Sequence, residues 1–187
     1  LWTPSAEQLA AANLSEFLHI ASQHSGKTLP DYDALWQWSV EDVSAFWSLI
    51  WDYGEAIGEK GDTALIEGKG MLDAQWFPQA QLNYAENLLR RNDDADALVF
   101  WGENKVKRRL SFSGLHAAVS KCQQALQAAG VVEGDRVAGY LPNMPETVIA
   151  MLATVSLGAV WSSASPDFGV EGVVDRFGQI EPTVLFC

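Results

Sequence analysis

The stretch Asp135–Ala164, DRVAGYLPNMPETVIAMLATVSLGAVWSSA, decides the fold of this chain. Its first seven residues, DRVAGYL, are typical of a buried strand, and its last six, AVWSSA, of a second one. Between these strands Pro145 suits the first turn of a helix, and the apolar spacing extends that helix to Gly158. A strand, a helix and a strand in this order predict two parallel strands joined by a right-handed crossover.

The alternation continues on both sides of this stretch. Residues 170–179 predict another helix, and residues 183–187, TVLFC, predict another strand. Upstream, Ser113 can cap a helix that stops at Gly130, a natural glycine for a helix end. The apolar face of that helix is formed by Leu115, Val119, Cys122 and Leu126. We therefore expect an α/β fold in which helices flank a parallel sheet.

A hairpin is expected before this region. Residues 97–102, ALVFWG, and residues 105–111, KVKRRLS, have the character of two strands, and Glu103 and Asn104 supply the turn between them.

The first 94 residues predict a helical and irregular segment. Ser5 and Gln8 have the spacing of a capping box at the start of a helix, and residues 25–35 are typical of a loop. Ser39 with Asp42 resembles a second cap, ahead of an amphipathic helix whose aromatic stripe we expect to be core. A further short helix is expected after Asn83.

Composition separates the same two parts. The 187 residues carry a net charge of −12, and residues 1–94 hold 15 of the 24 acidic side chains but only 5 of the 12 basic ones. Six of the eight tryptophans also precede residue 95. We therefore divide the chain into an acidic, Trp-rich segment, 1–94, and a second part, 95–187. The acidic balance argues against nucleic acid and anionic membranes as partners.

The cysteines and the apolar runs indicate a cytoplasmic protein. Cys122 and Cys187 are far apart and have no metal-binding spacing, which favours a reducing compartment. The first residues lack the pattern of a signal peptide, and the longest apolar stretch, residues 148–161, is too short to span a bilayer.

Common catalytic motifs are missing. Residues 67–71, EGKGM, contain a Gly-Lys pair but lack the other residues of a Walker A loop, and neither G-x-G-x-x-G nor G-x-S-x-G occurs. His19, His24 and His116 do not have the spacing of a zinc site. The residues themselves therefore assign no catalytic and no metal-binding side chain.

Two loops follow the expected parallel strands, at residues 142–146, PNMPE, and 163–169, SASPDFG. In open α/β sheets ligands bind outside the carboxyl ends of the strands, so either loop is a candidate ligand loop. The alternative is ordinary turn chemistry, in which Asp167 only caps the next helix and Arg176 pairs with Glu171 or Asp167.

Four segments resemble the acetoacetyl-CoA synthetases, acyl-CoA ligases of the adenylate-forming superfamily. They are LWTPSAEQLAAANLSEFL (1–18), LWQWSVEDVSAFWSLIWDY (35–53), WFPQAQLNYAENLL (76–89) and residues 130–186. The last segment contains SPDFG and DRFGQIEP, which discriminate best because acetyl- and propionyl-CoA synthetases usually carry a Gly-Gly-Phe type of turn there. The resemblance implies that residues 95–187 are the first part of a parallel-sheet, helix-flanked adenylate-forming (ANL-type) domain.

The resemblance also implies a two-step reaction. Acetoacetate and ATP, with Mg²⁺ balancing the phosphate charge, give acetoacetyl-AMP and pyrophosphate. The thiol of CoA then attacks the mixed anhydride and releases AMP. Acetoacetate, ATP and CoA are the small-molecule partners expected on this ground.

Several parts of the family pattern have no counterpart here. The Ser/Thr/Gly-rich phosphate loop, the adenine and metal motif, the ribose-binding Asp and the adenylation lysine find no match in these 187 residues. We therefore expect that this piece makes no adenylate alone and holds no cofactor tightly. In acetyl-CoA-type relatives the turn that matches Ser165, Pro166 and Asp167 lies against the CoA nucleotide. The resemblance thus implies that these three residues line the CoA side, although the turn sequence differs.

Two alternatives stay open. The chain is also compatible with another short-chain acyl-CoA synthetase, of the acetyl or propionyl type, or with a non-catalytic binding module of ligase-like fold. Because the strand TVLFC would form an apolar edge, we also expect the isolated piece to self-associate.

Overall fold

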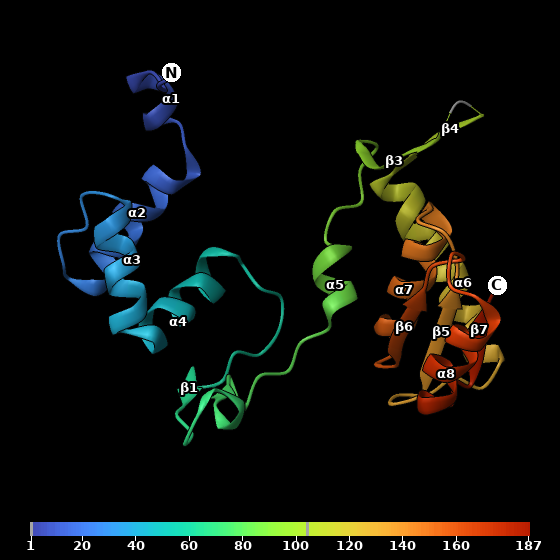
Figure 1. The fold of residues 1–187 in the computed structure, drawn as a ribbon. Helices are drawn as coiled ribbons and strands as arrows, with labels where there is room; N and C mark the ends of the chain where they lie inside the picture. Colours follow the sequence, from blue (N-terminus) through green and yellow to red (C-terminus); the bar gives the residue numbers. More distant parts are fainter. Residues whose placement is uncertain (1, 104) are drawn as a thin grey trace. The chain divides into compact units, whose positions relative to one another are not determined.

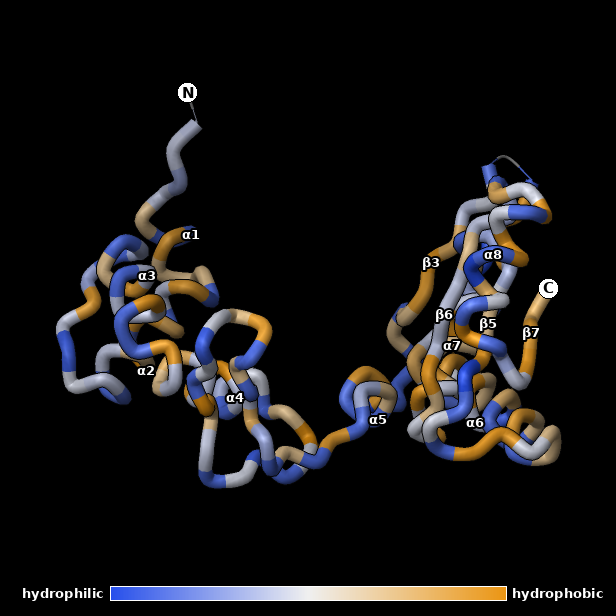
Figure 2. The backbone as a smooth tube through the Cα atoms, turned by 60° about the horizontal axis from the view of Figure 1, so that its bottom comes forward, coloured by the Kyte–Doolittle hydropathy of each residue, from blue (hydrophilic) through white to orange (hydrophobic). Residues whose placement is uncertain are grey.

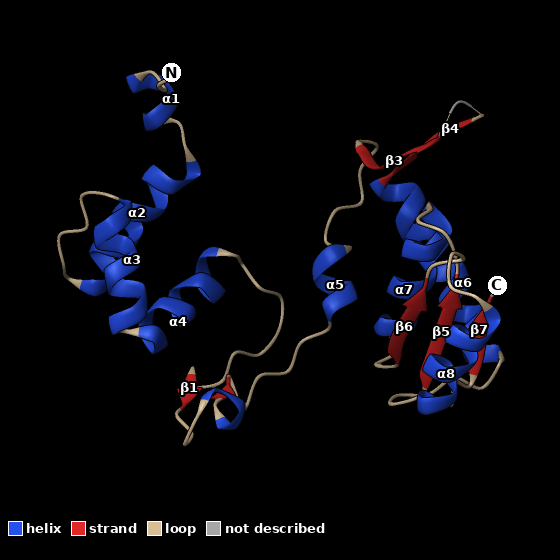
Figure 3. Ribbon diagram, in the orientation of Figure 1, coloured by secondary structure: helices blue, strands red, loops and turns tan. Residues whose placement is uncertain are grey.

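The computed structural model describes residues 2–103 and 105–187 of the chain. These form two compact units, Leu1–Gln81 and Leu82–Cys187. Helices dominate the first unit and a parallel sheet occupies the second (Figures 1 and 3). The boundary after residue 94, which composition suggests, stays a prediction.

The first unit is built mainly from four helices. They are α1 (Ala6–Ala10), α2 (Asn13–Ser25), α3 (Tyr32–Glu41) and α4 (Val43–Tyr53). A small antiparallel pair follows, with the 3₁₀ turn η1 (Met71–Asp73) between β1 (Leu65–Ile66) and β2 (Gln75–Trp76).

The capping box at Ser5 is confirmed. The Ser5 hydroxyl accepts a hydrogen bond from the Gln8 backbone N–H at 3.2 Å, and the Gln8 side chain accepts one from the Ser5 N–H at 2.9 Å. The helix ends at Ala10, however, and a new helix begins at Asn13, so one expected helix is two.

The expected loop over residues 25–35 is wrong in its last part, because α3 begins at Tyr32. Asp31 caps α3 by accepting a hydrogen bond from the Ala34 N–H at 2.9 Å. Ser39 therefore lies inside α3 rather than at a cap. Asp42 is itself the N-cap of α4.

The core of the first unit is small and aromatic. It consists of Phe17, Ala21, Leu29, Leu35, Trp38 and Leu49. Trp38 is 2% exposed and meets Phe46 edge-on at 5.8 Å between ring centroids. The expected burial of the aromatic stripe on α4 is only half correct, since Trp47 is 44% exposed and packs edge-on against Trp76.

The second unit alternates helices and strands after an initial hairpin. Its elements are α5 (Tyr84–Leu88), β3 (Asp96–Gly102), β4 (Val106–Ser111), α6 (Phe112–Ala128), β5 (Arg136–Tyr140), α7 (Pro145–Ser156), β6 (Val160–Ala164), α8 (Val170–Ile180) and β7 (Val184–Phe186). The α/β prediction is confirmed.

The three parallel strands have the order β6-β5-β7. Tyr140 at the end of β5 lies beside Ala164 at the end of β6, and Gly139 lies beside Phe186 of β7. Gly139 has a packing reason, because a Cβ there would lie 2.6 Å from the indole ring of Trp161.

Opposite faces of β5 contact different helices. Val137 belongs to the main core with side chains of α6 and α7, whereas Ala138 packs with Ala164 and with Phe177 of α8. Adjacent residues of a strand point to opposite faces, so the sheet is covered on both sides. Val137 and Ala138 are fully buried. In Figure 2 the tube of β7 has the colour of hydrophobic residues, whereas α8 contains both hydrophobic and hydrophilic residues. Burying a side chain such as that of Val137 contributes about 1.5–3 kcal/mol.

Two local expectations for this unit are confirmed and one is wrong. The hairpin is confirmed as antiparallel, with Trp101 opposite Lys107, while Asn104 of its turn lies outside the described residues. The N-cap of α6 is Ser111 and not Ser113, since the Ser111 hydroxyl accepts the Gly114 N–H at 3.1 Å. The cap at Asn83 is confirmed.

Within the described ranges, 2–103 and 105–187, no helix has the length and apolar character needed to cross a membrane.

Candidate functional site

The candidate site lies at the carboxyl edge of the parallel sheet. β5 ends at Tyr140 and β6 ends at Ala164, and the two loops that follow these strands emerge at the same edge because the strands are parallel (Figure 3). This is the edge at which open α/β sheets bind ligands.

The first loop, residues 142–146, leads into α7 and is held there by local contacts. Pro145 is buried at the first helical position, where its missing N–H costs nothing. The Thr147 hydroxyl donates to the carbonyl of Pro142 at 2.6 Å. Glu146 pairs with Arg108 of the hairpin at 2.5 Å, so the basic hairpin is tied to this loop.

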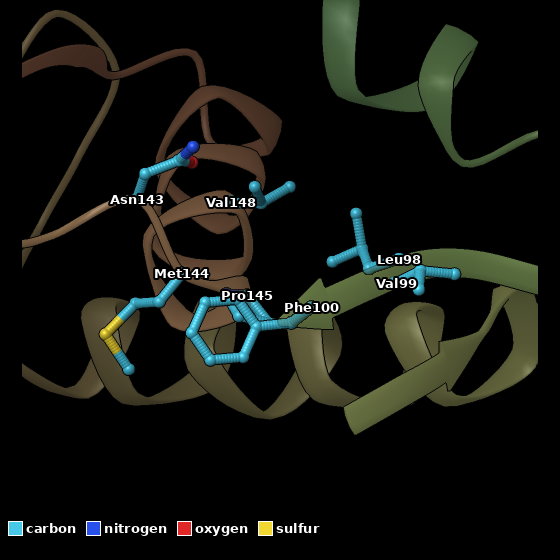
Figure 4. Close-up of a pocket in the computed structure, with 7 residues that line it drawn as sticks. All are labelled: Leu98, Val99, Phe100, Asn143, Met144, Pro145 and Val148. Atoms are coloured by element: carbon cyan, nitrogen blue, oxygen red, sulfur yellow. The ribbon is translucent and has the colours of Figure 1, made fainter. Parts of the chain in front are cut away.

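A small pocket of about 140 Å³ separates the hairpin from this loop (Figure 4). It is lined by Leu98, Val99, Phe100, Asn143, Met144, Pro145 and Val148. Of the seven side chains labelled in Figure 4, Asn143 is the one that carries an amide group, and the other six are apolar. The pocket is too small for a nucleotide, and its chemistry is that of apolar packing.

A second pocket, of about 380 Å³, lies on the other side of Met144. Its walls are Cys122, Leu141, Met144, Glu146, Ile149, Ala150, Phe186 and Cys187. Burial raises the pKa of the Cys122 thiol above its ordinary value. The thiol is therefore protonated at neutral pH and is a poor nucleophile. The pocket has mainly apolar walls. Its Glu146 carboxylate pairs with Arg108 through Oε1, while Oε2 is buried with no hydrogen-bond partner among the described residues.

The second loop forms a compact turn at Ser165–Phe168. The Ser165 hydroxyl donates to the Asp167 carboxylate at 2.8 Å and accepts the Asp167 N–H at 3.3 Å. From β5, the Tyr140 hydroxyl lies 2.9 Å from the carbonyl oxygen of Pro166 and 2.8 Å from that of Phe168. The turn is thus held by its own side chains and by the neighbouring strand.

The expectation that Asp167 caps the following helix is wrong. The N-cap of α8 is Gly169, and no side chain caps this helix. The expected partners of Arg176 are also not the ones observed. Its guanidinium lies 4.2 Å over the Phe168 ring and donates to the carbonyl of Gly172 at 3.0 Å.

The three residues predicted to line the CoA side therefore come together in one turn, with Pro166 and Asp167 exposed. Their role stays a prediction. Sequence reasoning missed Tyr140, and the only signal for it was an aromatic hydroxyl at the end of a buried strand. Among the residues that the structure describes, no group of three or more His, Cys, Asp or Glu side chains is placed to hold a metal ion.

Two families of known proteins match this chain. The family described as AMP-binding enzyme matches residues 85–187, which is more than half of the chain. The family described as acetyl-coenzyme A synthetase N-terminus matches residues 32–88.

Individual relatives give a consistent picture. An acetoacetyl-coenzyme A synthetase of Rhizobium meliloti (strain 1021) is 52% identical over 99% of this chain and 28% of its own length. An acetoacetyl-CoA synthetase of Xenopus tropicalis is 40% identical over 99% of this chain and 28% of its own length. The solved structure of acetoacetyl-CoA synthetase from Streptomyces lividans has 39% identity and a TM-score of 0.90, over 98% of this chain and 29% of that one. The chain thus spans less than a third of the length of these relatives.

Proposed function

The chain belongs to the AMP-binding enzyme family, and from this premise we propose that it is part of an acetoacetate–CoA ligase. The observation that carries the proposal is the fit of nearly the whole chain to the acetoacetyl-CoA synthetase of Streptomyces lividans. Both units take part in that fit, so the likeness is not limited to a common nucleotide-binding sheet.

The proposed reaction has two steps. A carboxylate oxygen of acetoacetate attacks the α-phosphorus of ATP, and pyrophosphate leaves with its electron pair. The sulfur of CoA then attacks the acyl carbon, and AMP leaves. A carboxylate is a poor electrophile until its oxygen becomes a good leaving group, so the enzyme's contribution is mainly orientation and charge stabilisation. Mg²⁺ would balance the phosphate charge, and we assign no ATP or Mg²⁺ ligand within residues 1–187.

Ser165, Pro166 and Asp167 are proposed to line the CoA side of the site. Support comes from their place at the carboxyl edge of the sheet and from the exposure of Pro166 and Asp167. The turn offers one carboxylate and a hydroxyl, both already bonded to each other. Such a preorganised turn suits recognition of a ligand's polar groups better than proton transfer.

The proposal is tested on the complete polypeptide that carries these residues. We expect acetoacetate to stimulate exchange of labelled pyrophosphate into ATP and, with CoA present, formation of the thioester and AMP. Pyrophosphate exchange that depends on acetate or propionate instead would favour the alternative of another short-chain ligase. The match of residues 32–88 to the family described as acetyl-coenzyme A synthetase N-terminus supports this alternative. Absence of exchange with every acid would favour a binding module. Residues 1–187 alone are expected to give no exchange.

Asp167→Ala tests the CoA-side turn in the same polypeptide. We expect the Michaelis constant for CoA to rise about fivefold, the equivalent of one hydrogen bond, while pyrophosphate exchange stays unchanged. The matched control is Asp175→Ala on exposed α8, whose carboxylate contacts only Gln179 at 3.5 Å among the contacts described. An unchanged Michaelis constant for CoA, with normal stability, would refute the assignment.

We further propose a cytoplasmic location, supported by the two cysteines, both free in the structure. Cell fractionation with a tagged complete protein tests this.

A further inference from the structure

Tyr140 joins the centre of the sheet to the turn after the neighbouring strand. It is the last residue of β5, and its ring packs on the α8 face of the sheet with Ala138, Ala164 and Phe177. This packing sets the position of the ring. The hydroxyl projects beyond the apolar cluster and meets the carbonyl oxygens of Pro166 and Phe168, at 2.9 and 2.8 Å.

The two carbonyl groups that Tyr140 contacts stand directly before and after Asp167. A phenol has a single proton, so the hydroxyl shares it between the two acceptors. The backbone on either side of Asp167 is thereby anchored to a rigid strand. The local bonds between Ser165 and Asp167 shape the turn but do not connect it to the sheet.

A second anchor comes from α8. Arg176 lies 4.2 Å over the ring of Phe168, and its guanidinium is oriented by the Gly172 carbonyl at 3.0 Å. Arg176 holds the end of the turn from outside, through a side chain. Tyr140 holds the backbone from inside, next to the residue proposed to face CoA. The two anchors therefore do different work.

We infer that Tyr140 is a positioning residue for the CoA step, because its hydroxyl keeps the Ser165–Phe168 turn in the arrangement that receives CoA. This inference rests on the proposed function of the turn. Tyr140 touches no reacting atom in this scheme and acts through the backbone beside Asp167. Preorganising a binding loop raises affinity by removing the cost of ordering it on binding.

Tyr140→Phe in the complete polypeptide is the direct test, since it keeps the ring and removes only the hydroxyl. We expect the Michaelis constant for CoA to rise about fivefold, with acetoacetate-dependent pyrophosphate exchange unchanged. The matched control is Tyr84→Phe, which removes a hydroxyl from a tyrosine that is 60% exposed on α5. The control is expected to leave both measurements unchanged.

Two further measurements separate positioning from a general structural role. Hydrogen exchange should be faster in Tyr140→Phe at the amides of residues 167–170 and unchanged in β5. The double variant Tyr140→Phe with Asp167→Ala should raise the Michaelis constant for CoA no more than the larger single change, because both act through one turn.

Each outcome decides. Equal losses in pyrophosphate exchange and in the CoA step would make Tyr140 a structural residue and overturn the inference. Faster amide hydrogen exchange throughout β5 would do the same. Additive effects in the double variant would overturn it as well. If Asp167→Ala raises the Michaelis constant and Tyr140→Phe does not, the turn assignment survives and this inference fails. If wild-type protein shows no acid-dependent exchange, the proposed function itself fails.

Discussion

At the scale of single residues, the Thr154 hydroxyl is one of the buried polar groups that have no hydrogen-bond partner among the described residues. The residue lies in α7 with no exposed surface, and its Oγ1 has no hydrogen-bond partner among the described residues. An unpaired buried hydroxyl costs free energy, whereas a methyl group of similar shape does not. We predict that Thr154→Val raises the free energy of unfolding by about 1 kcal/mol. Urea denaturation of the polypeptide 1–187 measures this.

The same helix provides the control. The Thr147 hydroxyl donates to the Pro142 carbonyl at 2.6 Å, so Thr147→Val removes a hydrogen bond that exists. That change is expected to lower the free energy of unfolding by about 1 kcal/mol. If Thr154→Val were destabilising instead, the hydroxyl would have a partner in solution.

Residue-scale predictions from sequence succeed where the partner is local. The Ser5 and Asn83 caps were predicted because each bond spans two or three residues. The arrangement of the turn around Asp167 was not predicted, because Tyr140 contacts the carbonyl groups of Pro166 and Phe168 across 26 and 28 residues of sequence. Turn composition gives no information about a strand that lies beside the turn only in the folded sheet.

At the scale of elements, the start of α6 tests the choice between two neighbouring serines. Ser111 accepts the Gly114 N–H at 3.1 Å, whereas Ser113 donates to the Asp94 carboxylate at 3.0 Å. We predict that Ser111→Ala lowers the free energy of unfolding by about 1 kcal/mol, the usual worth of an N-cap. The Ser113 hydroxyl also lies 3.0 Å from that of Ser111, but it is not the one that accepts the Gly114 N–H, so Ser113→Ala should cost less, about 0.5 kcal/mol. Urea denaturation gives both values, and the reverse order would contradict this assignment of the cap.

Elements were predictable in proportion to the strength of their periodicity. The run from β5 to β7 alternates clearly between apolar strands and helices with an apolar face, and each element was found. The helix α3 was missed because its first turn follows Pro30 and Asp31, which are also typical of a loop. Leu35 and Trp38 of α3 pack into the core of the first unit, a tertiary contact that the local sequence does not reveal.

At the scale of the whole molecule, the parallel arrangement was predicted but the strand order β6-β5-β7 was not. The alternation of helix and strand specifies right-handed crossovers, yet it does not specify on which side of β5 each later strand is placed. That choice follows from packing, such as the Trp161 indole over Gly139, which depends on both strands being in place.

The strand order leads to a prediction about the isolated polypeptide 1–187. In the described sheet β7 pairs only with β5, and its Leu185 is 50% exposed, so one edge of β7 presents backbone groups beside an apolar side chain. Such edges pair with other chains. We expect the polypeptide to sediment as a concentration-dependent mixture of monomer and larger species.

Leu185→Lys should shift it toward monomer, because a charge on an edge strand opposes pairing. Val160→Lys on β6, at the opposite edge and 52% exposed, is the matched control and should change little, because serines follow on that strand. A monomer at all concentrations would show that the β7 edge does not pair, and an equal effect of both lysines would point to charge alone.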